Sequence, residues 1–183
     1  MRAEALDQQR LYPAFHFFLR LVVLSLPLYL TILLSLSLYP LQYATAAQSA
    51  WALRGLGYLV TQDGAELATA LPGDQAAFHF FISEDSTAWK SFLFLFALLF
   101  AVPGIAWRKR LIGLAVGLPY LWLGNLSRVL AIVAVERSYG LQAALFTHDY
   151  LWRFGLISLV LAAWAVWLHW VLPRARTSRR KGE

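Results

Sequence analysis

The sequence predicts an all-α integral membrane protein with about four transmembrane helices and a small extracytoplasmic β-hairpin. Hydrophobic residues make up 60% of the chain and charged residues only 14%, whereas a soluble domain carries about a quarter charged residues. Several apolar runs approach the ~20 residues that a spanning helix needs. Basic residues cluster beside these runs, as they do at the cytoplasmic ends of transmembrane helices. A chain of 183 residues has room for a single membrane domain, 1–183.

The composition also argues against several classes of function. A net charge of +6 is compatible with nucleic-acid binding, but the basic residues lie next to apolar runs and leave no basic face between them. We therefore expect no nucleic-acid partner and interpret the charge as a determinant of membrane topology. The chain has no cysteine and its four histidines are scattered, so we expect no disulfide, no metal site and no cofactor.

The apolar run at 17–39 predicts the first transmembrane helix, after a polar lead-in over residues 1–15. Pro27 is expected to kink this helix, and the carbonyl group left without its helical partner needs a donor from Thr31, Ser25 or a neighbouring helix. Between 41 and 60, apolar residues recur at helical spacing with polar residues between them. This pattern favours an amphipathic helix on the membrane surface over a second span.

Residues 58–82 combine strand-like runs with turn residues. The runs at 58–60 and 78–82 are rich in aromatic and β-branched residues, and the segments 62–64 and 71–74 contain the Gly, Pro and Asp typical of turns. We expect a small β-hairpin or short sheet here, outside the bilayer, within an extracytoplasmic segment at 41–86. His79 lies in the second run, where a packed or surface histidine is the simplest interpretation.

Three further transmembrane helices are predicted at 87–107, 111–135 and 150–172. Asp85 or Ser86 is a suitable N-cap for the first of them, and Pro103-Gly104 marks its far end. We expect a loop at 136–149 between the last two helices, and a basic tail at 173–183.

The distribution of basic residues orients the chain. Most Lys and Arg residues fall near the amino terminus, in the cluster at 108–110 and in the tail, whereas 40–86 and 136–149 contain only Arg54 and Arg137. Cytoplasmic loops carry the excess of basic residues. We therefore expect a multi-pass protein of the plasma membrane with both termini in the cytoplasm.

Lys90, Arg128 and Arg153 are charged residues inside predicted spans. A guanidinium near a helix centre costs about 2.5–3.5 kcal/mol on insertion scales, so such residues usually face a protein interior and have a function. Arg128 lies about 26 Å along its helix from the cytoplasmic start at Leu111, at 1.5 Å per residue. This places Arg128 in the outer leaflet. Three helices thus bring Ser86, Arg128 and His148 to one layer near the external surface.

These three side chains suit nucleophilic acyl transfer. Ser86 would attack a carbonyl, the imidazole of His148 would move the proton, and the guanidinium of Arg128 would stabilise the oxyanion. Each also has a simpler explanation: Ser86 as an N-cap, Arg128 as the partner of an acid or a lipid headgroup, and His148 as an ordinary interfacial residue. Their shared depth is the observation that supports a joint role.

At these residues the sequence resembles the exosortase/archaeosortase family of integral-membrane cysteine transpeptidases. Asp85-Ser86-Thr87-Ala88-Trp89-Lys90-Ser91 is similar to the archaeosortase form Asp-Cys-Thr-Gly-Trp-Lys-Ser. Asn125-Leu126-Ser127-Arg128 matches the family's Asn-x-x-Arg, and His148-Asp149 matches a third block. The resemblance covers about residues 80–170.

The resemblance implies that Ser86 stands at the position of the nucleophilic cysteine, that Arg128 is the essential arginine and that His148 is the third catalytic residue. It also implies substrate proteins with a carboxy-terminal signal made of a short motif, a transmembrane helix and a basic cluster. The enzyme would cut near the motif and transfer the protein to an acceptor, such as a membrane lipid. The expected substrate-binding or supporting residues are Asp85, Thr87, Trp89, Lys90, Asn125 and Arg153.

Two residues depart from the family pattern. A serine hydroxyl is far less acidic than a thiol, so we expect Ser86 to leave this form inactive. Ala88 replaces a glycine and adds a Cβ near the scissile carbonyl. An engineered Cys-to-Ser substitution would give such a cysteine-free chain, as would a natural inactive or serine-based member. We favour the engineered substitution because the flanking motif is intact.

Two other functions remain open. The first is a non-catalytic membrane protein that binds sorting-signal helices and escorts or anchors them. The second is a small transporter or channel subunit with Arg128 and Lys90 along a polar path. The third predicted span is mostly apolar below Arg128, so the transporter ranks last.

Overall fold

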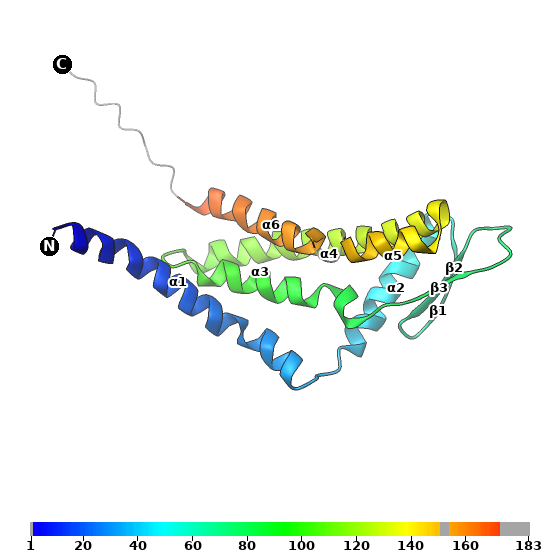
Figure 1. Ribbon diagram of the computed structural model, residues 1–183, viewed down its shortest axis with the longest axis horizontal. Helices are drawn as coiled ribbons and strands as arrows, with labels where there is room; N and C mark the ends of the chain where they lie inside the picture. The colour runs from blue at the N-terminus through cyan, green and yellow to red at the C-terminus, as the bar shows by residue number, and fades with distance from the viewer. Residues whose placement is uncertain (1, 151–153, 173–183) are drawn as a thin grey trace, which may run out of the picture.

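The computed structural model describes residues 2–150 and 154–172. Helices α1 (Arg2–Leu33), α3 (Trp89–Ala101), α4 (Trp107–Tyr139) and α6 (Leu156–Val171) form an elongated bundle, in which α1 packs on α3 while α3, α4 and α6 contact one another (Figure 1). Helices α2 (Tyr39–Gly55) and α5 (Leu141–Tyr150) lie toward the end that carries a small sheet. The mostly helical fold with a small sheet, which the sequence predicts, is confirmed.

Two clusters of buried apolar side chains hold this arrangement together, and α4 contributes to both. The first joins α3, α4 and α6 in the bundle: Leu95, Leu98, Leu99, Leu121, Val160, Trp167 and Val171. The second joins α2, the sheet and α4: Ala46, Ala50, Leu67, Ile82 and Val129. Because one rigid helix takes part in both, α4 fixes the sheet end relative to the bundle.

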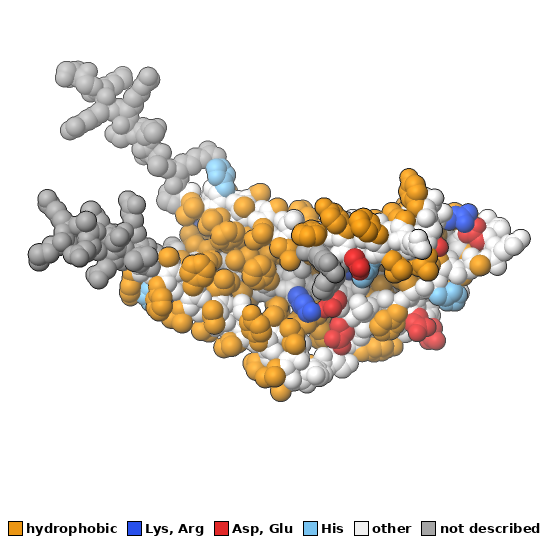
Figure 2. All heavy atoms as spheres, in the orientation of Figure 1, with side chains coloured by type: hydrophobic (Ala, Val, Ile, Leu, Met, Phe, Trp, Pro, Cys, Tyr) orange, Lys and Arg blue, Asp and Glu red, His pale blue; other side chains and the backbone are white. Residues whose placement is uncertain are grey.

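The outer surface of the bundle is apolar. Large side chains such as Val116 and Val166 are 67% and 71% exposed. Figure 2 shows apolar side chains covering the bundle, whereas the acidic side chains lie toward the sheet end. Soluble monomers rarely expose apolar patches of this extent, so the surface suits contact with lipid.

Within the described residues, two helical segments are long and apolar enough to cross a membrane: Ala14–Leu33 within α1, and α4. Helices α3 and α6 are apolar but shorter, with 13 and 16 residues. Thirteen helical residues extend about 20 Å, less than the ~30 Å of a hydrocarbon core. The four predicted transmembrane helices therefore stay a prediction.

The first helix differs from the span predicted at 17–39. It ends at Leu33, because Ser35 takes a left-handed φ of 47° and Pro40 lies in the first turn of α2. Thr31 does not serve the carbonyl that Pro27 leaves without a partner, which belongs to Val23. Instead its Oγ1 donates to the carbonyl of Pro27 itself at 2.8 Å.

Helix α2 also differs from its prediction. It ends at Gly55 rather than at 60, and Gly57 with φ of 90° turns the chain into the sheet. Its buried face points to the sheet and to α4, while Trp51, one of its apolar residues, is 74% exposed. That buried face consists of Gln42, Ala46, Ser49, Ala50 and Leu53.

The sheet is an antiparallel meander in the order β1-β2-β3, formed by β1 (Leu59–Asp63), β2 (Glu66–Ala70) and β3 (Phe78–Phe81). Strand β3 coincides with the predicted run at 78–82. Strand β1 starts in the run predicted at 58–60 but continues through Gln62 and Asp63, so the turn predicted at 62–64 comes too early. Strand β2 was missed because its sequence contains Glu66 and two alanines, which have low strand propensity. Pairing with a neighbour on each side makes this segment a strand.

The loop predicted at 136–149 is wrong. Helix α4 continues to Tyr139, Gly140 adopts a φ of 82° that permits a sharp break, and α5 follows at once. Ala144 of α5 is buried, and α5 packs along α4. The helix is therefore stabilised by a tertiary contact that local polarity does not indicate.

Arg110 has a structural role beyond its place in the basic cluster. Its guanidinium donates to the carbonyl of Phe100 at 2.7 Å, of Val102 at 2.9 Å and of Ile105 at 3.1 Å. The last carbonyls of a helix lack partners within the helix. Arg110 of α4 thus satisfies the end of α3 and fixes the turn between the two helices.

Candidate active site

Ser86 lies in a 3-10 turn, η1 (Glu84–Thr87), between β3 and α3. Its Oγ is 3.1 Å from Ser83 Oγ, and Thr87 Oγ1 donates to the carbonyl of Glu84 at 2.8 Å. The hydroxyl groups of Ser86 and Thr87 therefore bond locally, to the turn itself or to the residue just before it. The prediction of Asp85 or Ser86 as the N-cap of α3 is wrong, because Ala88 occupies that position without any side-chain cap.

Ala88 adopts a left-handed conformation with φ of 60°. This conformation costs a residue with a Cβ roughly 1–2 kcal/mol, and glycine would avoid that cost but gain entropy in the unfolded state. We expect Ala88→Gly to raise the free energy of unfolding by roughly 1 kcal/mol. Unfolding in mixed micelles of detergent and dodecyl sulfate measures the change.

Ala106 provides the matched control for Ala88. It precedes α4 with an ordinary extended φ of −60° and is exposed. Ala106→Gly should therefore not raise the free energy of unfolding, and should slightly lower the unfolding midpoint. Equal shifts for both substitutions would mean that Ala88 carries no backbone strain.

Arg128 and Asn125 come from α4, one turn apart on one face. The Nδ2 of Asn125 donates to the carbonyl of Ser86 at 2.9 Å, which ties η1 to α4. Arg128 is only 5% exposed, yet none of its three guanidinium nitrogens has a hydrogen-bond partner in the described part of the chain. A buried charge without a partner is costly. We therefore expect the partner to be a group that binds from outside the chain.

His148 lies near the end of α5, with Nδ1 at 3.2 Å from Asp149 Oδ1. Ser86, Arg128 and His148 line one cavity of about 200 Å³. Strand β3 and helix α5 form its two walls, and α4 contributes Val129 and Ile132 beside Arg128. The structure thus brings together the three residues that the sequence places at one depth.

A family model described as transmembrane exosortase (Exosortase_EpsH) matches residues 8–168, a range that includes Ser86, Arg128 and His148. The chain belongs to the transmembrane exosortase family. Exosortases are membrane proteins of a cysteine-type transpeptidase family that processes sorting signals. Neither the search of curated proteins nor the search of solved structures found a match.

The predicted supporting residues of this exosortase family member fall into separate places. Asp85 and Lys90 form an ion pair with each other, and Lys90 Nζ lies 5.7 Å from the ring centre of Trp89. All three line a different cavity, of about 430 Å³, beside the end of α1. Thr87 and Asn125 line a third cavity of about 110 Å³. Arg153 lies outside the described residues.

The walls of the exosortase cavity were missed at the level of sequence. Leu141, Ala144 and Leu145 from α5 were assigned to a loop, although they precede His148 at helical spacings of seven, four and three residues. From β3, the aromatic rings of Phe78 and Phe80 stack at 5.2 Å between centroids and line the opposite wall. Counting back from His148 by helical turns would have found the α5 wall.

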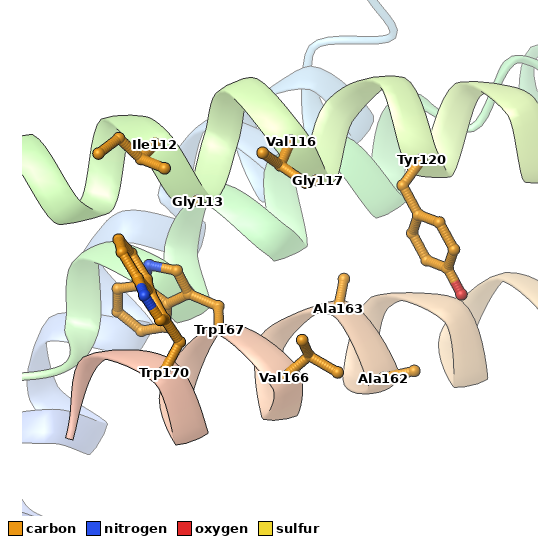
Figure 3. Close-up of a pocket in the computed structure, with 10 residues that line it drawn as sticks. All are labelled: Ile112, Gly113, Val116, Gly117, Tyr120, Ala162, Ala163, Val166, Trp167 and Trp170. Atoms are coloured by element: carbon orange, nitrogen blue, oxygen red, sulfur yellow. The ribbon is translucent and has the colours of Figure 1, made fainter.

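A larger cavity of the exosortase fold, about 480 Å³, lies between α4 and α6 (Figure 3). Apart from the ring nitrogens of two tryptophans and the hydroxyl of Tyr120, its lining is apolar, and it contains no acid, base or nucleophile. Among the residues that the structure describes, no group of His, Asp and Glu could hold a metal ion. The cavity with Ser86 is therefore the candidate active site.

Proposed function

We propose that this protein has the site of a sortase-like membrane transpeptidase, which cleaves carboxy-terminal sorting signals of exported proteins and transfers the proteins to an acceptor such as a lipid. In this form, Ser86 leaves the site inactive. The observations that carry the proposal are the cavity that Ser86, Arg128 and His148 line together, and the buried guanidinium of Arg128, which has no hydrogen-bond partner among the described residues.

The chemistry follows from the three side chains once position 86 carries a thiol. The thiol gives its proton to His148, the resulting thiolate attacks the carbonyl carbon of the scissile peptide, and Arg128 donates hydrogen bonds to the oxyanion that forms. The C–N bond then breaks, and His148 passes that proton to the leaving amine. A nucleophilic group of the acceptor attacks the resulting thioester and gives its own proton to His148, which returns it to the departing thiolate so that the thiol is regenerated.

The inactivity of the present form has support from hydrogen bonding. The Oγ of Ser86 contacts Ser83 Oγ, and the structure contains no hydrogen bond between Ser86 and the imidazole of His148 within its described residues. A serine hydroxyl needs an adjacent base to become a nucleophile. The same observation favours a second candidate function, in which the protein binds sorting-signal helices and escorts or anchors them without cleavage.

Ser86→Cys separates the two functions. The full-length variant is reconstituted in membranes with proteins of the same organism that carry a motif, an apolar helix and a basic tail at the carboxy terminus. We expect the loss of the tail, detected by mass spectrometry, with Ser86→Cys and not with the unmodified chain. Ser83→Cys is the matched control, since its side chain adjoins Ser86 but lines the cavity with Lys90.

The outcomes discriminate between the candidates. Cleavage by Ser86→Cys alone supports the transpeptidase. If Ser86→Cys binds the tail tightly and never cleaves it, the binding function is correct and the enzymatic proposal fails. Equal cleavage by both variants would show that position 86 has no special role.

We also propose that both termini lie in the cytoplasm and that the sheet and the cavity face the outside. The chain has no cysteine, so single thiols can be introduced at Gln75, in the exposed β2–β3 connection, and at Ala106, between α3 and α4. In intact cells, a membrane-impermeant maleimide should label Gln75→Cys and not Ala106→Cys. Both should react after lysis. The reverse pattern in intact cells would invert the topology.

A further inference from the structure

We propose that the substrate segment preceding the scissile bond binds as a fourth strand on the free edge of β3, parallel to β3. This inference rests on the proposed function. It adds how the substrate is held and which chemistry the segment needs: an extended main chain with free N–H groups, and apolar side chains on the face toward the cavity.

The register determines which backbone groups of β3 are free. The N–H of Ile82 donates to the carbonyl of Ala65 at 2.9 Å, so residue 82 directs its polar groups toward β2. In an antiparallel pair this direction alternates along the strand. Phe78 and Phe80 therefore also point their polar groups toward β2, whereas His79 and Phe81 point theirs away from the sheet.

The two edge strands of the sheet, β1 and β3, differ in how far other parts of the chain cover them. Strand β1 lies against α2, and the guanidinium of Arg54 donates to the outward carbonyl of Val60 at 3.0 Å. Proteins usually block an edge strand in such a way, because an open edge pairs with other chains. In the described residues no hydrogen bond reaches the outward groups of His79 or Phe81. In the described residues, the edge of β1 is thus partly covered by α2 and Arg54, whereas no element or side chain bonds the edge of β3, which is open to an added strand.

The open edge leads directly to the candidate nucleophile. Ser86 follows Phe81 by five residues, and Phe78 and Phe80 line the same cavity as Ser86 and Arg128. A segment that ends at Ser86 and lies along β3 must run in the direction of β3, so the pairing is parallel. Its last carbonyl then lies at the cavity that Arg128 lines between β3 and α5, where it can accept from a guanidinium that has no hydrogen-bond partner in the described residues.

This binding mode divides affinity and selectivity between two kinds of contact. Main-chain hydrogen bonds to an edge strand are independent of side chains, and pockets for alternate side chains give specificity. Residues of the segment that point into the cavity meet Phe78, Phe80 and Leu141, and are therefore expected to be apolar. Proline is excluded wherever an N–H faces β3.

A tethered peptide tests the pairing without knowledge of the sorting motif. Ser86→Cys, as the full chain in nanodiscs, is joined by a disulfide to acetyl-Thr-Val-Thr-Val-cysteamide. We expect amide hydrogen exchange in residues 78–82 to slow about tenfold, as backbone hydrogen bonds form at His79 and Phe81. Two further peptides carry N-methyl groups on alternate amides. The peptide with N-methyl groups on the amides that face β3 should give no protection. The peptide with N-methyl groups on the other amides should protect residues 78–82 as the unmethylated peptide does.

Variants of His79 provide a second check. Edge strands accept proline where the N–H points away from the sheet, so His79→Pro should fold and lose the protection by the unmethylated peptide. His79→Ala keeps the main-chain donor and should retain it. Absence of protection by the unmethylated peptide, or equal protection by both methylated peptides, would overturn the inference.

The proposed function and this inference can fail separately. Cleavage by Ser86→Cys with no protection of β3 would leave the transpeptidase intact and remove the added strand. Protection of β3 with no cleavage of any tail would support the binding mode and contradict the enzymatic function.

Discussion

Arg128→Lys, made together with Ser86→Cys, should lower turnover of a cleaved substrate by about 10²–10³, the usual cost of losing one oxyanion donor. Lysine keeps the positive charge but lacks the planar fork of donors that a carbonyl oxygen and its neighbours can share. Asn125, which orients η1 through the carbonyl of Ser86, remains in place. Rates of tail release in reconstituted membranes measure the effect.

Arg137→Lys is the matched control on the same helix. Arg137 is half exposed and pairs with Asp74 at 2.9 Å, outside the cavity with Ser86. The control should leave turnover nearly unchanged. Full activity of Arg128→Lys would show that a positive charge suffices and that the guanidinium geometry has no part in the reaction.

Replacement of Arg128 by an apolar residue should raise the stability of the protein although it abolishes activity. Arg128→Met removes a buried charge that has no hydrogen-bond partner in the described chain, so the free energy of unfolding should rise by about 1–3 kcal/mol while activity is lost. A residue that is retained for structure alone would show the reverse effect on stability. If Arg128→Met unfolds the protein, the guanidinium contributes to folding and the assignment to substrate binding is weakened.

Arg110→Ala should destabilise the protein more than any other single change among the basic residues at 108–110. Three carbonyls at the end of α3 and in the following turn lose a charged donor. A hydrogen bond to a charged group contributes about 1.5–3 kcal/mol, and the three bonds share one side chain. We therefore expect a loss of about 3 kcal/mol in the free energy of unfolding.

Arg108→Ala removes the same charge from the same cluster and is the control for Arg110. Arg108 is exposed and makes no side-chain hydrogen bond within the described residues. Its replacement should leave the unfolding midpoint within experimental error. Unfolding of both variants in mixed micelles compares them directly, and equal losses would assign the effect to charge rather than to the three carbonyls.

The sequence by itself determined the family of this protein and selected the three candidate residues that the structure places around one cavity. Hydropathy shows that long stretches of the chain suit lipid, and the spacing of Asn125 and Arg128 puts both on one helix face. Helix rise alone predicts that Arg128 reaches the depth of Ser86. These inferences succeed because periodicity and hydropathy are local properties, which neighbouring residues determine.

Only the tertiary structure decided the walls of the cavity and the roles of several polar residues. Helix α5 forms where a loop was expected because Ala144 packs along α4, and η1 replaces a helix N-cap because Ser86 and Thr87 bond within the turn. Arg110 donates hydrogen bonds to carbonyls at the end of α3, in addition to belonging to the basic cluster from which the orientation of the chain in the membrane is predicted. Each of these features depends on a contact between segments, and no local sequence pattern indicates which segments come into contact. Packing and hydrogen-bond geometry therefore decided the walls of the cavity and the partners of these polar side chains, which sequence periodicity does not specify.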